Sequence, residues 1–293
     1  MTQLLGLILL FVLIAGGLYA TGAEAVVSAL PFELSLICGT ALATLLLGNS
    51  PDVARQAAGG FARAFRGSGW DRAAHLELLT LLHELTRHVR QGGHVAIESD
   101  LEAPESSPLF ARAPKVLADG DMRDLICDAF RLMAIDMREP QRVREQMQQV
   151  IDMRVSERMR AVSALHTLAD ALPALGIVAA VLGIIKTMAA IDQSTAVIGA
   201  MIASALLGTF LGVFLAYGLV GPIAARFGQI VEDEAGALDT ASRFIAAFAA
   251  GAPPRVALEM AIASIPADRR PALDEIDRRI HAARFSEAPR RAA

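Results

Sequence analysis

The sequence has few aromatic residues, few cysteines and no excess of positive charge, and each scarcity excludes a class of function. Aromatic residues are 5% of the 293 residues, which is too few for a base-stacking surface. The formal net charge is −4, so the chain also lacks the basic stripe of a general nucleic-acid binder. The two cysteines, Cys38 and Cys127, lie in an apolar and a charged segment respectively, which argues against a structural disulfide. We therefore expect no nucleic-acid partner.

Sequence motifs of enzyme and metal chemistry are absent as well. The chain contains no phosphate loop with Gly-Lys-Ser or Gly-Lys-Thr, and it has no Gly-x-Ser-x-Gly turn. The six histidines lack the spacing of metal ligands; they are His75, His83, His88, His94, His166 and His281. The sequence therefore predicts neither an enzyme nor a metal site, and it indicates no organic cofactor.

Charge is missing from four long apolar segments. They cover residues 4–20, 34–48, 172–185 and 196–225, and the third extends past Lys186 toward Ile191. The mean hydropathy of +0.45 is high for a soluble protein, yet 20% of the residues are charged. Because about 20 apolar residues cross a bilayer, we predict four transmembrane helices that form two hairpins.

The positions of the basic residues predict the orientation of these helices. No lysine or arginine precedes Arg55, and the connections at 21–31 and 190–195 carry only acidic charge. The positive-inside rule then places the middle segment and both termini in the cytoplasm. Without a basic n-region, the first helix is predicted to be retained rather than cleaved as a signal peptide.

Four domains follow from this topology. They are a transmembrane hairpin (1–50), a cytoplasmic helical domain (51–171), a second transmembrane hairpin (172–225) and a cytoplasmic helical tail (226–293).

The cytoplasmic segments have helical periodicity throughout. Apolar residues three and four apart predict an amphipathic helix over 71–90, ended by Gly92 and Gly93. A second helix is predicted over 121–137. A third begins at Pro140 and continues into span three, with Pro173 as its first point of bending. After span four we expect a helix to about Ala250, a break at 251–254 and a short helix after Pro271. The predicted class is an all-α polytopic membrane protein.

Acidic side chains are placed only at the ends of the predicted spans. Glu33 and Asp192 are assigned to the outer ends, and Asp170 is assigned to the inner end. Proton relays through membranes use buried titratable groups. If this chain serves ion flow, we therefore expect the essential carboxylate to come from a second polypeptide.

Small residues in spans three and four predict close helix packing. Gly208 and Gly212 are separated by one helical turn in span four, and Gly176, Ala180 and Gly183 follow one another in span three. Two interpretations stay open: the two spans pack on each other, or they form a groove for a partner helix.

Three further residues lie beside these small positions. Thr209 adds a hydroxyl, which in a membrane helix ordinarily bonds to its own turn. Pro173 and Pro222 are assigned to the cytoplasmic ends of their spans. Each is either an ordinary helix-end proline or a point of bending in a mechanical coupling.

Several segments together resemble the MotA family, the ion-channel subunits of bacterial flagellar stators. They are LPALGIVAA at 172–180, GTFLG at 208–212, LAYG at 215–218 and Pro222. The likeness covers nearly the whole chain and includes Glu33, Gly48-Asn49, Arg90-Gln91 and Glu98-x-Asp100.

The resemblance implies an inner-membrane protein of bacterial motility and chemotaxis that couples ion flow to torque. Five such subunits surround two MotB-like subunits, which carry the ion-binding aspartate and attach to peptidoglycan. The cytoplasmic charges Arg90 and Glu98 would engage a FliG-like rotor protein. Pro173 and Pro222 would couple ion passage to movement, and Thr209 would lie near the ion path. Tyr217 is grouped with the packing glycines.

Ion choice is inferred from one position. Sodium-driven members of the family tend to have threonine where this chain has Ala180, and a hard cation prefers oxygen ligands. We therefore predict that the transported ion is H⁺. Two alternatives remain open: a TolQ- or ExbB-like energiser of an envelope protein, and a membrane scaffold without ion flux.

Overall fold

The computed structural model describes residues 2–20, 24–135 and 140–287, and every regular element in these ranges is helical. The longer helices are α1 (Thr2–Ala20), α2 (Glu24–Gly48), α3 (Pro51–Arg66), α4 (Arg72–Gly92), α7 (Gly120–Ile135), α8 (Pro140–Ala189), α9 (Thr195–Phe214), α10 (Gly221–Ala249), α11 (Pro254–Ile262) and α12 (Leu273–Glu287). The short ones are η1 (His94–Ile97), α5 (Glu98–Glu102), η2 (Pro104–Ser106), η3 (Phe110–Arg112), α6 (Pro114–Ala118) and the π-helix η4 (Leu215–Val220). The all-α prediction is confirmed.

The chain forms two compact units. The first consists of Met1–Gly67 and Glu157–Ile230, and the second of Ser68–Ser156 and Val231–Ala293. Helices α8 and α10 therefore have residues in both units. The four predicted domains divide the chain by membrane topology rather than by compactness, and they stay predictions.

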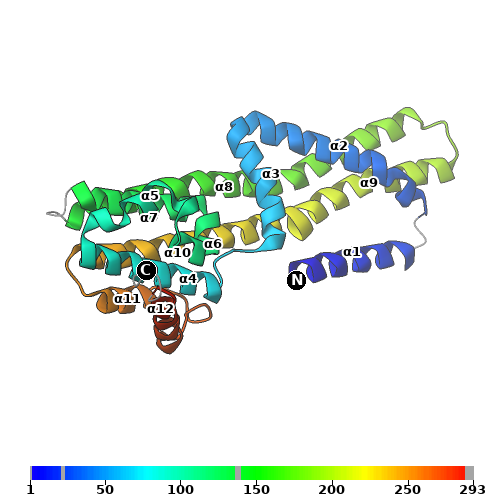
Figure 1. Cartoon of the computed structure of the whole chain (residues 1–293). Helices are drawn as coiled ribbons and strands as arrows, with labels where there is room; N and C mark the ends of the chain where they lie inside the picture. Colours follow the sequence, from blue (N-terminus) through cyan, green and yellow to red (C-terminus); the bar gives the residue numbers. More distant parts are fainter. Residues whose placement is uncertain (1, 21–23, 136–139, 288–293) are drawn as a thin grey trace. The chain divides into compact units, whose positions relative to one another are not determined.

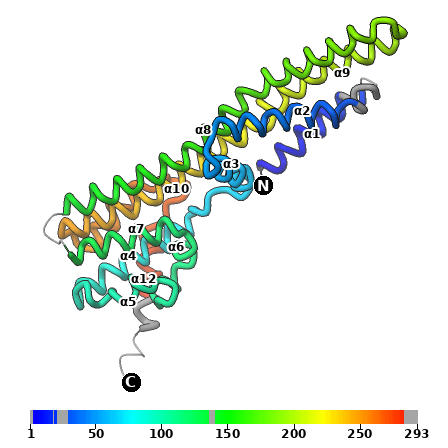
Figure 2. The backbone as a smooth tube through the Cα atoms, turned by 90° about the horizontal axis from the view of Figure 1, so that it is seen from above, coloured from blue at the N-terminus to red at the C-terminus, as the bar shows by residue number. Residues whose placement is uncertain are grey.

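The first unit contains the apolar helices. Figures 1 and 2 show α2 beside α9, and the C-terminal part of α8 forms a hairpin with α9. Ile37, Leu172 and Leu211 belong to the buried core that joins these three helices. The hairpin turn ends at Ser194, whose hydroxyl accepts a hydrogen bond from the Val197 amide and caps α9.

Three helical segments in the described ranges are long and apolar enough to cross a membrane. They are Ala29–Gly48 and apolar windows within Pro140–Ala189 and Thr195–Ala249. The apolar part of α1, Gln3–Gly17, is shorter. Three of the four predicted crossings thus have the required length and composition, and the first stays a prediction.

The second unit is built around α4. The Asp71 carboxylate accepts the Ala74 amide at 2.8 Å and caps the helix, while Gly93 with φ +72° follows its end. The buried face of α4 packs against α6, α11 and α12 (Figure 1). The helix predicted over 71–90 is therefore confirmed.

Two of the longer helices in the described ranges were not predicted, and both begin with proline. Helix α3 begins at Pro51 behind the Ser50 cap, and α11 begins at Pro254 inside the predicted break. Helix α7 ends the described segment at Ile135, so the predicted end at residue 137 lies outside the described residues. The start of α8 at Pro140 and the end of α10 near Ala250 agree with the sequence analysis.

Candidate functional site

The two helices of the α8–α9 hairpin are in direct backbone contact. A Cβ added to Gly176 would lie 2.7 Å from the Gly208 carbonyl oxygen and 2.9 Å from the Gly212 Cα. A Cβ added to Gly212 would lie 2.7 Å from the Leu172 carbonyl oxygen. Since lipid provides no hydrophobic drive between helices, close van der Waals contact of this kind holds them together.

The remaining small residues extend this contact in both directions. A Cβ on Gly183 would lie 2.6 Å from the Ala205 Cβ, and one on Gly208 would lie 3.1 Å from the Ala180 amide nitrogen. The four glycines thus pack spans three and four on each other. Tyr217 does not share the contact, because it lies in η4 and is 69% exposed. The prediction that Tyr217 packs together with these glycines is therefore corrected.

Glu33 from α2 enters the same contact. It is 4% exposed, and its Oε2 would lie 3.2 Å from a Cβ on Gly208. Oε2 is buried and has no hydrogen-bond partner among the described residues. Lys186 on α8 is near enough to attract the carboxylate electrostatically.

This geometry corrects one conclusion from the sequence. Glu33 lies one turn inside the apolar segment Ala29–Gly48, opposite Gly208. At about 1.5 Å per residue, Gly208 is itself about 20 Å along α9 from its first residue. The chain therefore has a buried carboxylate of its own between its apolar helices, although spans three and four carry none. A second polypeptide is not the only source of an acid.

Ala180 and Thr209 are placed differently relative to the contact between α8 and α9. Ala180 is 7% exposed and lies in the contact with Gly208, so α9 covers it within this chain. Thr209 follows Gly208 in α9 and is only half-buried. The structure thus brings Glu33, Ala180 and Gly208 together and leaves the Thr209 side chain at the edge.

The two prolines have different local effects. Helix α8 continues through Pro173 without interruption, although the ring removes the amide that would bond to the carbonyl of Ala169. Pro222 is the second residue of α10 and lies two residues after the end of η4; the Gly221 amide, which caps η4, donates to the Ala216 carbonyl five residues earlier. Sequence analysis left Pro222 open as an ordinary helix-end proline or a point of bending, and it did not predict the π-helix. Short π segments inside α-helices are frequent at functional sites.

The predicted rotor residues lie in the second unit. The Arg90 guanidinium donates to the Ala252 carbonyl at 3.1 Å and lies 5.8 Å from the centroid of the Phe248 ring. Glu98 begins α5 and is exposed. Arg90 is therefore also a structural link to the C-terminal tail, whereas Glu98 faces solvent.

Metal-ligating side chains are not clustered in the described part of the second unit. Within the described ranges, no group of three or more histidine, cysteine, aspartate or glutamate side chains could hold a metal ion. His75 is buried with its Nδ1 2.9 Å from the Asp71 carbonyl oxygen, and burial lowers its pKa below the ordinary value. Burial also raises the pKa of the Cys127 thiol to about 11.

Apolar spanning helices, a glycine-mediated helix contact and a buried acid inside it define a polytopic helical membrane protein. The family model described as "Motility protein A N-terminal" matches residues 4–93, and the "MotA/TolQ/ExbB proton channel family" model matches residues 118–240. The Motility protein A of Salmonella typhimurium is 31% identical over 284 residues, which cover 97% of this chain and 96% of the relative. The chain belongs to the motility protein A family.

Other relatives and solved structures agree with this assignment. Chemotaxis protein LafT of Vibrio parahaemolyticus is 31% identical over 95% of this chain and 98% of the relative. A chain of the C. jejuni MotAB structure matches with a TM-score of 0.74 at 19% identity, over 93% of this chain and 98% of that one. A chain of the flagellar MotAB stator complex from Bacillus subtilis matches with a TM-score of 0.71 at 18% identity, over 91% of this chain and 96% of that one. The structural matches show the shared fold.

Proposed function

We propose that this chain is the ion-conducting subunit of a bacterial flagellar stator and couples inward proton flow to torque on the rotor. The observation that carries the proposal is identity of 31% along almost the whole chain to proteins named for motility and chemotaxis. The match of residues 4–93 to a model specific to motility protein A favours the stator over the TolQ- or ExbB-like energiser.

The proposed complex contains a MotB-like single-span subunit, with five copies of this chain around two of that partner. The solved relatives are MotAB complexes, which supports the partner class. Apolar side chains on the outer faces of α8 and α9 also support assembly. Ile177, Val181, Leu206 and Phe210 are exposed in the single chain, where lipid or neighbouring subunits would cover them.

Ion transfer is proposed to use an aspartate of the partner beside the α8–α9 contact. One charge that crosses about 100 mV releases about 2.3 kcal/mol, several times the thermal energy. Protonation of that aspartate changes its need for solvation and therefore its fit against the helix pair. Because α8 and α10 have residues in both units, these two helices are the elements through which movement reaches the second unit.

The second unit is proposed to act on a FliG-like rotor protein through Arg90 and Glu98. Exposure of Glu98 supports this role, since an exposed charge is available to a partner. The proposed location is the bacterial inner membrane with both termini in the cytoplasm. The absence of lysine and arginine before Arg55 and in the 190–195 connection supports this orientation.

Complementation tests the function directly. The chain is expressed with its MotB-like partner in a bacterium that lacks its own stator, and swimming is measured against external pH and external sodium. We expect swimming that a protonophore abolishes and that sodium does not change. Dependence on sodium at constant pH would reject the proton assignment. Failure of this chain to co-purify with the single-span partner would reject the stator.

A further inference from the structure

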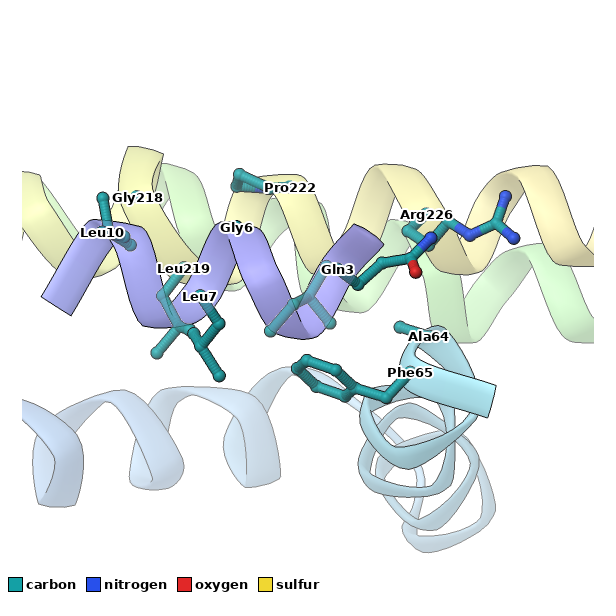
Figure 3. Close-up of a pocket in the computed structure, with 11 residues that line it drawn as sticks. Gln3, Gly6, Leu7, Leu10, Ala64, Phe65, Gly218, Leu219, Pro222 and Arg226 are labelled. Carbon is teal, nitrogen blue, oxygen red and sulfur yellow. The ribbon is translucent and has the colours of Figure 1, made fainter. Parts of the chain in front are cut away.

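An apolar cavity of about 300 Å³ opens within the first unit. It lies between α1, the end of α3 and the segment where η4 joins α10 (Figure 3). Gly6, Leu7 and Leu10 line it from α1, while Phe65 and Leu219 line it from the other elements. Figure 3 shows the Phe65 ring and the Leu7 side chain on the side of the cavity nearest α3.

One end of this cavity is cationic. Arg226 lines it, and Figure 3 shows its guanidinium extending beyond Gln3, at the end of the cavity opposite Leu10. One terminal nitrogen of Arg226 donates to Gln229 Oε1 at 3.0 Å. The Nε atom is buried and has no hydrogen-bond partner in the part of the chain that the structure describes. A buried guanidinium N–H without a partner is costly, and an anion would satisfy it.

The position of the cavity along the chain matches the edge of a bilayer. The uncharged segment 193–225 ends immediately before Arg226. The end of α3 lies close to Arg226, because a Cβ added to Gly67 would be 3.6 Å from one terminal nitrogen of that arginine, and the last turn of α3 carries Arg63 and Arg66. Apolar surface on one side and clustered arginines on the other are the two requirements of a phospholipid.

We propose that this cavity binds one anionic phospholipid, with an acyl chain between α1 and Phe65 and the phosphate at Arg226. Arginine is the side chain best suited to this headgroup, because its planar fork donates two parallel hydrogen bonds to phosphate oxygens. The division of the cavity into an apolar end and a cationic end matches the two parts of one phospholipid, the acyl chain and the anionic headgroup.

Two variants separate the apolar and the cationic contributions. A Cβ at Gly6 meets no atom within 4 Å and Gly6 lines the cavity, so we expect the ring of Gly6→Phe to occupy it. Gly16→Phe is its matched control, because Gly16 lies on the same helix, also has open space and does not line the cavity. Arg226→Gln removes the charge. Its control is Arg55→Gln, which removes a charge from an α3 side chain that is 83% exposed.

The full chain in complex with its single-span partner is purified in detergent and incubated with phosphatidylglycerol or with phosphatidylcholine of identical acyl chains. Native mass spectrometry then measures bound lipid. We expect the unaltered complex to retain about tenfold more phosphatidylglycerol, the amount that one charge-assisted hydrogen bond contributes. Arg226→Gln abolishes this preference, Gly6→Phe lowers retention of both lipids, and both controls bind like the unaltered complex.

Three outcomes overturn the proposal. Equal retention of the two lipids by the unaltered complex would show that the site does not recognise the anionic headgroup. Unchanged retention of phosphatidylglycerol in Arg226→Gln would show that Arg226 does not bind it. Competition by inorganic phosphate at the same concentration as the lipid would indicate an anion site without an acyl chain. If Gly6→Phe fails to fold, Arg226→Gln carries the test alone, because it removes none of the apolar lining.

Discussion

Glu33 on α2 and Gly208 on α9 face each other so closely that a Cβ at position 208 would lie 3.2 Å from the Glu33 Oε2. The absence of a side chain at Gly208 therefore makes room for a carboxylate between apolar helices. Without a hydrogen-bond partner for Oε2 among the described residues, the acid is held there at a cost in stability. Such a cost is typical of positions that serve function rather than folding.

Replacement of this acid should separate stability from function. We expect Glu33→Leu to raise the free energy of unfolding by about 1–3 kcal/mol, because it removes an unsatisfied buried group. Swimming should nevertheless decrease. Thermal unfolding in detergent and motility of the complemented strain measure the two effects. Asp192→Asn, at an exposed position, is the control. A destabilised Glu33→Leu with normal motility would falsify this interpretation.

The backbone contact between α8 and α9 predicts a steric effect. Gly212→Ala places a methyl group 2.7 Å from the Leu172 carbonyl oxygen, so the helices must separate. We expect destabilisation of about 1–3 kcal/mol, the usual cost of overpacking. Gly199→Ala on the same helix meets no atom within 4 Å and should be neutral. Equal unfolding midpoints for the two variants would contradict the contact.

The two proposed rotor-contact residues, Arg90 and Glu98, should respond differently to charge reversal. Arg90→Glu loses a hydrogen bond to Ala252 and the contact with Phe248, so we expect the second unit to be destabilised by about 1 kcal/mol. Glu98→Lys should leave stability unchanged, because Glu98 is exposed. Both reversals should reduce swimming.

Opposite charge changes on the rotor protein then distinguish the two roles. They should restore swimming fully for Glu98→Lys and only partly for Arg90→Glu. Full rescue of both variants would show that the internal contacts of Arg90 are unimportant.

The stability of the second unit should depend on pH through His75. Burial lowers its pKa below 6.5, while attraction from Asp71 and Asp233 and repulsion from Arg269 make smaller contributions. In the unfolded chain this histidine titrates near 6.5, so below that pH the unfolded state binds more protons than the folded state. Stability should therefore fall as the pH decreases below 6.5.

Unfolding midpoints at several pH values between 5 and 8 measure this dependence. His75→Gln should reduce it, since glutamine does not titrate. An identical pH dependence in the variant would assign the effect to other groups.

Cys127 should report the opening of the second unit. Its thiol is 4% exposed and has a pKa of about 11, so the reactive thiolate is scarce at neutral pH. In a Cys38→Ser background, maleimide should label the folded protein far more slowly than the urea-unfolded protein. Comparable labelling rates would place Cys127 at the surface.

The sequence predicted those elements whose buried faces consist of large apolar residues. Leu78, Leu82 and Leu85 define the inner face of α4 unmistakably. Helix α3 is strongly amphipathic, but it was missed because its buried face consists of small residues, such as Ala57 and Gly60, whereas the sequence analysis followed periods of larger apolar residues. Helix α11 was missed because Pro253 and Pro254 at its start were interpreted only as a break in the chain.

The sequence predicted only the part of the site that lies within single helices. Glycine spacing within one helix is visible in a sequence, so Gly176, Gly208 and Gly212 were found. The burial of Glu33 depends on the pairing of α2 with α9, which are far apart along the chain. The π-helix before Pro222 was likewise invisible, because apolar composition does not distinguish it from an α-helix. Sequence periodicity reports one helix at a time, whereas these features arise between helices or from a single extra residue.

That extra residue in η4 has a geometric consequence for everything that follows it. A wider turn accommodates one additional amino acid, so each side chain after Gly221 is turned by about 100° from its direction in an uninterrupted helix. Deleting one codon anywhere in this turn would restore the ordinary winding and turn Phe227 away from Gly60. The direction in which the side chains of α10 point around the helix axis is thus set by one inserted residue. A single insertion or deletion of one codon can add or remove it.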